Sequence, residues 1–214
     1  MCSSPSVLKS QGEIELAIKV SSWAPANWVH TRCRPGDWVT FRYIDTYTQC
    51  SSYIDNYLQL RFGGDFYYPF EDLKERHSLL LLAGGVGINP LLSIFRHSGE
   101  LLSAGDSSGP RRVSLLYTAA TEEELLFREE ISEQCSKKET FTSQFFVTRE
   151  KTGSEEFTHR RMTKSDLENV LCDKEDTERK ICFICGPPKM VEQVKNWLIE
   201  LNVSAENIRY ELWW

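Results

Sequence analysis

The sequence is short of several features that would assign it to a particular class of protein. No apolar run approaches the roughly 20 residues needed to cross a bilayer, so no membrane span is expected. The seven cysteines are odd in number and scattered in spacing, which fits reduced thiols rather than a disulfide framework. The net charge of −6 is not offset by any basic block, and we therefore expect no nucleic-acid partner.

The first ten residues do not resemble a targeting signal. Residues 1–10, M-C-S-S-P-S-V-L-K-S, lack the apolar core of a signal peptide and the Arg-rich pattern of a transit peptide, so no targeting segment is expected in this chain. A metal site is not expected either, because His30 and His97 have no partner at ligand spacing. The composition is otherwise ordinary, with 41% apolar and 26% charged residues among 214, enough for one full core and part of a second.

The most informative stretch is residues 79–90, L-L-L-L-A-G-G-V-G-I-N-P. Its apolar start is typical of a strand buried on both faces of a parallel sheet. Gly84, Gly85 and Gly87 follow, and the residues beyond them take up helical spacing, with Pro90 suited to the first turn. A strand, a glycine turn and a helix aim backbone N–H groups at a phosphate, and glycine lets the backbone come close. The stretch predicts a dinucleotide-binding turn, although the same glycines would also suit the packing of a plain strand–turn–helix.

Strand and helix patterns alternate from residue 78 to the C-terminus. Strands are predicted at residues 78–83, 112–117, 143–148, 180–185 and 208–212. Helices are predicted at residues 89–102, 122–135 and 188–201, with a short one opened by the cap-like pair Thr163 and Asp166. Successive βα units imply an α/β fold with a five-stranded parallel Rossmann-like sheet, whose ligand lies at the carboxyl ends of the strands.

The first part of the chain follows another pattern. Residues 13–20 alternate apolar and polar side chains, which predicts a half-buried antiparallel strand. A helical stretch at 27–33 and a strand-like stretch at 59–62 follow. About three strands are too few to close a barrel. We therefore expect an incomplete domain at residues 1–77 ahead of a nucleotide-binding domain at residues 78–214.

With these segments placed, the chain resembles the ferredoxin–NADP reductase superfamily. G-G-V-G-I-N-P at 84–90 resembles its pyrophosphate turn, C-G-P-P-K-M at 185–190 its nicotinamide-side motif, and T-R-E at 148–150 its segment near the adenosine ribose. The resemblance implies a flavin-binding antiparallel β-barrel ahead of the nucleotide domain. It also implies FAD with NAD or NADP as cofactors, hydride transfer between nicotinamide and flavin, and an unknown electron acceptor.

The resemblance assigns the nucleotide contacts to particular residues. The pyrophosphate would lie against the turn formed by Gly84, Gly85, Val86, Gly87, Ile88, Asn89 and Pro90. Gly186 would let the nicotinamide approach closely, and Pro187 would stiffen the turn behind it. Thr118 and Arg149 would lie toward the adenosine. Arg149 is either a partner of the NADP 2′-phosphate or an exposed surface residue, which leaves NAD and NADP open.

Two residues are implied to lie beside the reacting atoms. The Cys185 thiol would form a small polarizable wall against the nicotinamide and would not act as a nucleophile, the alternative being a buried structural cysteine. Trp214, in the terminal Y-E-L-W-W, would shield the flavin ring, the alternative being packing at the edge of the last strand. Cys182 completes a C-x-x-C with Cys185 but is predicted to be a buried hydrophobe on the same strand.

Two departures from the family pattern bear on function. Cys2, Ser3 and Ser4 resemble the tail of the flavin motif, whose Arg, stacking aromatic and first Ser are absent, so we expect an N-terminally shortened form of a longer protein. Tyr-rich residues 40–58 interrupt a family strand and are predicted to be an insertion, either a stacking surface or a loosely held excursion.

Two functions follow from the shortened flavin motif. One is a flavin-dependent NAD(P)H oxidoreductase, and the other is a module that binds NAD(P) without turnover because FAD is not held. A third possibility is an unstable product, since an open half-barrel exposes apolar strand edges. A mitochondrial location of the full-length protein is expected from the resemblance alone.

Overall fold

The structure is a computed structural model that describes residues 2–22, 24–37, 39–43, 58–62, 66–69, 77–107, 109–150, 155–171 and 179–212. The chain divides into two compact units. The larger unit comprises Met1–Ala17 and Tyr68–Trp214, and the smaller comprises Ile18–Tyr67. No helix within the described ranges is long and apolar enough to cross a membrane.

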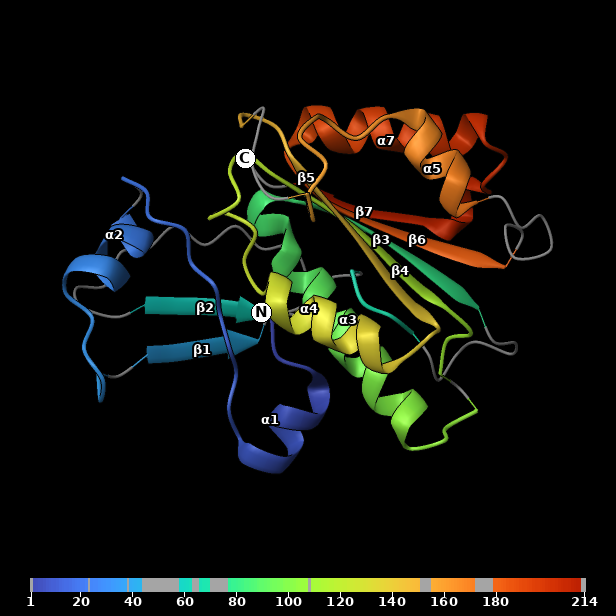
Figure 1. The fold of residues 1–214 in the computed structure, drawn as a ribbon. Helices are drawn as coiled ribbons and strands as arrows, with labels where there is room; N and C mark the ends of the chain where they lie inside the picture. Colours follow the sequence, from blue (N-terminus) through green and yellow to red (C-terminus); the bar gives the residue numbers. More distant parts are fainter. Residues whose placement is uncertain are drawn as a thin grey trace. The chain divides into compact units, whose positions relative to one another are not determined.

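The larger unit is built on a five-stranded sheet in which all neighbouring strands are parallel (Figure 1). In spatial order the strands are β5 (Phe141–Val147), β4 (Val113–Ala119), β3 (Ser78–Gly84), β6 (Lys180–Gly186) and β7 (Ile208–Leu212). Every residue of β3 and β6 is buried, as expected of central strands covered on both faces. The predicted parallel α/β sheet is confirmed, because each strand lies within two residues of its predicted bounds.

Helices cover both faces of this sheet. They are α3 (Ile88–Ser103), α4 (Arg128–Lys137), α5 (Lys164–Val170) and α7 (Pro188–Glu200). Figure 1 shows α3 and α4 on one face and α5 and α7 on the other. Leu80 and Leu82 belong to the core cluster under α5 and α7, which includes Val194. On the opposite face Phe95 meets Phe141 edge to face, with ring centroids 5.0 Å apart.

The helix predicted at residues 122–135 begins later than expected. Residues 120–127 form turns, and α4 starts at Arg128, so Thr121 is not its N-cap. The cause is Phe127, whose φ of 62° lies in the left-handed region and interrupts a right-handed helix. The Tyr117 hydroxyl also donates to the carbonyl of Glu124 at 3.0 Å, which ties the turns to β4.

The smaller unit holds α2 (Ala24–Thr31) and two strands, β1 (Val39–Tyr43) and β2 (Leu58–Phe62). The two strands pair in parallel, with Val39 opposite Leu58. The antiparallel barrel is therefore not confirmed by the part of the chain that the structure describes. The predicted insertion at 40–58 starts inside β1, and its residues 44–57 lie outside the described residues.

The antiparallel strand predicted at residues 13–20 is wrong, because the structure assigns no strand to this stretch. The alternation that suggested it persists in burial over residues 13–16 alone: Ile14 and Leu16 are half-buried and Glu13 and Glu15 are exposed, whereas Val20 is 69% exposed. A period of two shows that alternate side chains face inward, but it cannot supply the partner strand that a ladder needs. The predicted boundary at residue 77 stays a prediction, although the contacts group residues 1–17 with the larger unit.

The predicted pair at the start of α5 is confirmed as a capping box. The N–H of Thr163 donates to the Asp166 carboxylate at 2.7 Å, and Arg160 donates to both of its oxygens at 2.6 and 2.7 Å. The hydrogen bonds from Arg160, with those from Thr163, lower the pKa of Asp166 to about 2 although burial opposes this shift. The ionised carboxylate is thus favoured by folding.

We expect Asp166→Asn to lower the free energy of unfolding by about 1 kcal/mol at pH 7. The pKa of Asp166 is lowered from 3.8 to about 2 in the folded chain, so its contribution is complete above about pH 4. That contribution is lost as the pH falls toward 2. Urea denaturation of both proteins at several pH values measures this directly. A difference between them that stays constant from pH 7 to pH 2.5 would contradict the assignment.

Candidate nucleotide-binding site

The predicted nucleotide motifs meet at the carboxyl ends of two neighbouring central strands. Gly84 ends β3 and Gly186 ends β6, and the adjacent residues Ala83 and Cys185 are partners in the sheet register. The chain builds β3, β4 and β5 in one direction and then crosses back to add β6 and β7 on the other side of β3. The strand order therefore reverses between β3 and β6. Open α/β sheets bind their ligands in the crevice at such a reversal.

The two turns at this point pack backbone against backbone, and this packing accounts for three glycines. A Cβ on Gly87 would lie 2.2 Å from the carbonyl oxygen of Cys185, and one on Gly186 would lie 3.0 Å from the Cα of Gly84. A Cβ on Gly84 would lie 2.5 Å from the sulfur of Met190. A side chain at Gly87 would push the two turns apart because backbone faces it, and Gly186 packs tightly on Gly84. Gly84 itself also faces the side chains of Met190 and Pro187.

Gly85 is different, and it is the residue that indicates a ligand. Its φ is +55°, and a Cβ placed on it would meet nothing within 4 Å. A one-turn 3-10 helix, η2 (Gly85–Gly87), leads into α3, whose N-terminus has no side-chain cap. Open space therefore lies beside the turn that leads into a 16-residue helix, whose N-terminus no side chain caps. The positive end of the helix dipole favours an anion such as a phosphate there.

The other predicted contacts in the two turns offer mainly their backbone. Ile88 is fully buried, and Val86 and Pro90 are half-buried. The Asn89 side chain is only 2% exposed and is bonded inside the protein. Pro187 is exposed and leads directly into α7. A dinucleotide in this crevice would thus meet Gly85, Val86 and Pro90, the partly exposed residues of the glycine turn and of the first turn of α3.

Two residues predicted to lie toward the adenosine reach the same edge of the sheet. Thr118, near the end of β4, is opposite Gly84 in the register, which places it one strand away from the glycine turn. Arg149 follows β5, and its N–H donates to the carbonyl of Ala120 at 2.9 Å. Its side chain is exposed. A bond from Arg149 to a 2′-phosphate stays a prediction.

Sequence reasoning missed a polar cluster beside this edge. The Glu150 carboxylate accepts the N–H of Glu122 at 2.9 Å. His159 bonds the carbonyl of Glu150 through Nδ1 at 3.1 Å, and its Nε2 lies 3.6 Å from the Glu122 carboxylate. Only the T-R-E motif at 148–150 hinted at one member, because the three residues are distant in sequence.

Both cysteines of the C-x-x-C are fully buried in β6. Burial raises the pKa of Cys182 to about 12. Burial also raises the pKa of Cys185, and the nearby Glu211 carboxylate raises it further. These thiols stay protonated at neutral pH, so neither is a nucleophile. Contact between Cys185 and a nicotinamide stays a prediction, and Trp214 lies outside the described residues.

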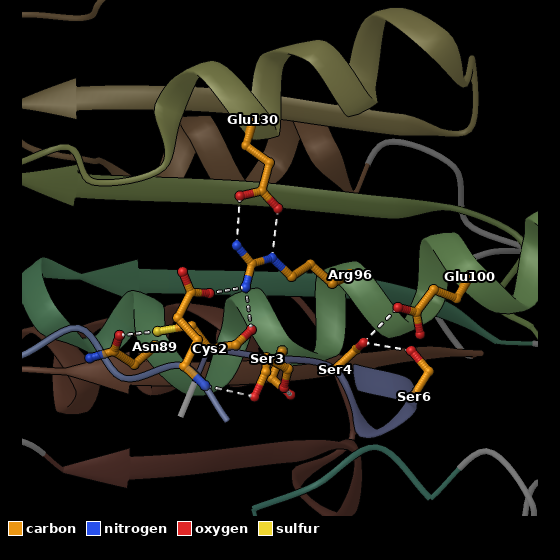
Figure 2. Close-up of polar contacts among 10 residues, drawn as sticks. Cys2, Ser3, Ser4, Ser6, Asn89, Arg96, Glu100 and Glu130 are labelled. Atoms are coloured by element: carbon orange, nitrogen blue, oxygen red, sulfur yellow. Dashed lines mark hydrogen bonds and ion pairs between the residues drawn. The ribbon is translucent and has the colours of Figure 1, made fainter. Parts of the chain in front are cut away.

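The predicted flavin-side residues are buried against α3 (Figure 2). Cys2, Ser3 and Ser4 are between 0 and 2% exposed. The Ser3 hydroxyl accepts the N–H of Glu15 at 3.2 Å, and the Ser4 hydroxyl donates to the Glu100 carboxylate at 2.5 Å. The Cys2 thiol likewise donates to a side chain of α3. Each of these three side chains thus already bonds a protein group, and contact between them and a flavin stays a prediction.

A glycine turn at the reversal point of a parallel sheet defines a dinucleotide-binding domain. The comparison with protein families agrees: the model for the oxidoreductase NAD-binding domain matches residues 81–196, more than half of the chain. The chain therefore belongs to the oxidoreductase NAD-binding domain family. Within the described residues, no group of His, Cys, Asp and Glu side chains gathers that could hold a metal ion.

A curated relative extends the match beyond this domain. The chain is 34% identical over 222 residues to oxidoreductase NAD-binding domain-containing protein 1 of Danio rerio, which covers all of this chain and 74% of that protein. The chain spans 64–65% of the length of relatives with the same name from other vertebrates.

Solved structures show the same fold. The cytochrome b5 reductase-containing domains of human Ncb5or, in their NAD+ form, align with a TM-score of 0.59 at 23% identity over 69% of this chain and 39% of that one. A ferredoxin NADP+ reductase from Neisseria gonorrhoeae with bound FAD and NADP aligns with a TM-score of 0.53 at 22% identity. That alignment covers 66% of this chain and 58% of the reductase. At these identities the likeness concerns the fold alone.

We expect Gly85→Ala to weaken the binding of NADH about tenfold, because a methyl group would enter the open space beside the phosphate-binding N–H groups. Gly105→Ala is the matched control. Gly105 has a φ of +70° and equally open surroundings, but it lies beyond the other end of α3. Both variants carry a similar backbone strain of about 1–2 kcal/mol. Fluorescence titration with NADH separates them, and equal dissociation constants for both would rule out this turn as the site.

We expect Gly87→Ala to lower the stability of the whole domain, whereas Gly85→Ala mainly weakens the binding of NADH. Its methyl group would overlap the Cys185 carbonyl, where only backbone movement can make room. We expect the free energy of unfolding to fall by about 1–3 kcal/mol. Thermal melting of Gly87→Ala and Gly85→Ala, recorded without nucleotide, measures the difference. A Gly87→Ala protein as stable as the original chain would contradict the packing of turn on turn.

Proposed function

We propose that this chain works as the nucleotide-binding part of a flavin-dependent NAD(P)H oxidoreductase that passes electrons to an acceptor still to be identified. One observation carries the proposal: the uncapped N-terminus of α3 and the open space at Gly85 lie at the reversal point of the sheet. Membership in the oxidoreductase NAD-binding domain family and the fold shared with cytochrome b5 and ferredoxin reductases support it.

The described residues provide for binding and orientation of the dinucleotide. The N–H groups that follow Gly85 would hold the pyrophosphate, and the absence of a side chain at Gly186 would let the nicotinamide end lie near the end of β6. Cys185, protonated and buried, would form an uncharged wall there. FAD, when bound, supplies the redox-active ring. The chain's contribution is to hold the nicotinamide in one orientation, which accelerates transfer by proximity.

A second function, a module that binds NAD(P) without turnover, is favoured by a specific observation. The flavin-side remnant at Cys2, Ser3 and Ser4 is buried, and its side-chain polar atoms already bond within the chain. A flavin held through these side chains would have to displace those bonds. The module would use the glycine turn alone, and it would give no electron transfer.

The visible absorption spectrum of the purified chain, recorded before and after adding NADH or NADPH, distinguishes the two functions. We expect a flavin band, present at isolation or after incubation with FAD, that bleaches when the reduced dinucleotide is added. Titration with NADH while its fluorescence is followed provides the companion measurement. Saturable NADH binding with no flavin band would establish the module, and absence of both signals would contradict both functions.

A further inference from the structure

One face of α3 is polar along most of its length, and this face carries the N-terminal segment, defined as residues 2–17. The side chains are Asn89, Ser93, Arg96 and Glu100, whose spacing of four, three and four residues places them on one side of a helix. Each forms a hydrogen bond with the N-terminal segment. The helix that begins at the candidate phosphate site is thus bonded to one segment over about three turns.

Asn89 holds both ends of that segment at once. Its side-chain carbonyl accepts the Cys2 thiol at 2.7 Å, and its amide nitrogen donates to the carbonyl of Ala17 at 2.9 Å. Asn89 as a whole is 2% exposed. Figure 2 shows its side chain directed at Cys2. Asn89 is also the second residue of α3, two residues beyond the glycine turn Gly85–Gly87, where Gly85 faces open space. One residue therefore joins the phosphate-binding turn to the N-terminal segment.

Arg96, two turns further along α3, also holds the N-terminal segment against this helix. Its guanidinium donates to both oxygens of Glu130, on α4, at 2.6 and 2.7 Å, and to the carbonyl of Cys2 at 3.0 Å (Figure 2). It also donates to the Glu15 carboxylate. Since α3, α4 and the segment share this one charged group, movement of the segment's first residues relative to α3 would break charge-assisted bonds. A displacement at Asn89 is therefore resisted by the rest of the helix.

An asparagine is suited to this place because its amide group both donates and accepts. An aspartate would place a carboxylate against the Ala17 carbonyl. An alanine would leave the half-buried carbonyl of Ala17 and the buried thiol of Cys2 without these partners. Loss of the side chain would free the first turn of α3 from the segment. The glycine turn Gly85–Gly87 that leads into it would then be less fixed for an incoming phosphate.

We propose that Asn89 is a positioning residue for the dinucleotide, because its side chain couples the phosphate-binding turn to the N-terminal segment. This proposal rests on the proposed function, since it requires a dinucleotide at that turn. Binding then stabilises the segment, and by reciprocity an ordered segment strengthens binding. Asn89 acts through the backbone and the segment, and its side chain does not touch the ligand.

Hydrogen exchange measured by mass spectrometry, with and without saturating NADH, tests the coupling on the full chain. In the unaltered chain we expect NADH to slow exchange both at residues 84–90 and at residues 3–17. In Asn89→Ala we expect about tenfold weaker binding and, at saturating NADH, slowing at residues 84–90 without slowing at residues 3–17. Tenfold is the effect of one net hydrogen bond transmitted to the site.

Ser93→Ala is the matched control. It removes the bond from the Ser93 hydroxyl to the carbonyl of Ser3, 2.7 Å long, one turn away from the phosphate-binding turn. We expect faster exchange in residues 3–17 before NADH is added, continued slowing when it is added, and a dissociation constant within about twofold of the original. An Asn89→Ala protein that binds NADH as tightly as the original and still slows exchange in residues 3–17 would overturn the proposal.

If Asn89→Ala does not fold, hydrogen exchange in the unaltered chain still tests the coupling between the turn and the N-terminal segment. Slowing at residues 84–90 with none at residues 3–17 would overturn the coupling while leaving dinucleotide binding intact. No slowing at residues 84–90 would instead refute the proposed function. Cys2→Ala, which removes one of the two Asn89 bonds, should weaken binding by less than Asn89→Ala does. If Cys2→Ala binds NADH as tightly as the original chain, and exchange in its residues 3–17 is also unchanged, the proposed coupling through Asn89 would be contradicted.

Discussion

The site depends on one close approach of backbone to backbone, where the turn after β3 rests on the end of β6. Gly87 lies so near the Cys185 carbonyl that no side chain fits, and Gly186 packs tightly against the Cα of Gly84. This contact fixes the start of α3 at the point where the strand order reverses. Gly85 is then left to face open space, beside N–H groups that no side chain caps. The packing thereby creates a place for an anion.

The strands of the sheet could be predicted from sequence because each is marked by a pattern within a few consecutive residues. Residues 79–83 are apolar without a break, which is typical of a strand whose side chains are buried on both faces of the sheet. The start of α4 could not be predicted in the same way, since three glutamates and a threonine suggest a helix N-terminus while the φ of Phe127 delays it. The barrel strand at residues 13–20 failed because pairing depends on a partner strand, which alternation cannot reveal.

The motifs of the candidate site were recognisable, but the separate tasks of their residues were not. The sequence shows three glycines in one turn, whereas only the structure shows that Gly84 and Gly87 serve packing and Gly85 faces open space. Asn89 was predicted as a cofactor contact, yet its side chain points into the protein and bonds Cys2 and Ala17. Contacts between residues so distant in the chain leave no periodic trace in a single sequence.

The central claim is that a dinucleotide binds at the turn between β3 and α3, and amide NMR spectra of the nitrogen-15-labelled chain during titration with NAD+ test it most directly. We expect the signals of Gly85, Val86, Gly87, Ile88 and Asn89 to shift in a saturable way, because these residues form the glycine turn and the start of α3, beside which the pyrophosphate would lie. Signals at the opposite, amino-terminal ends of the strands should stay in place. Shifts confined to those distant ends, with the turn unaffected, would contradict the claim.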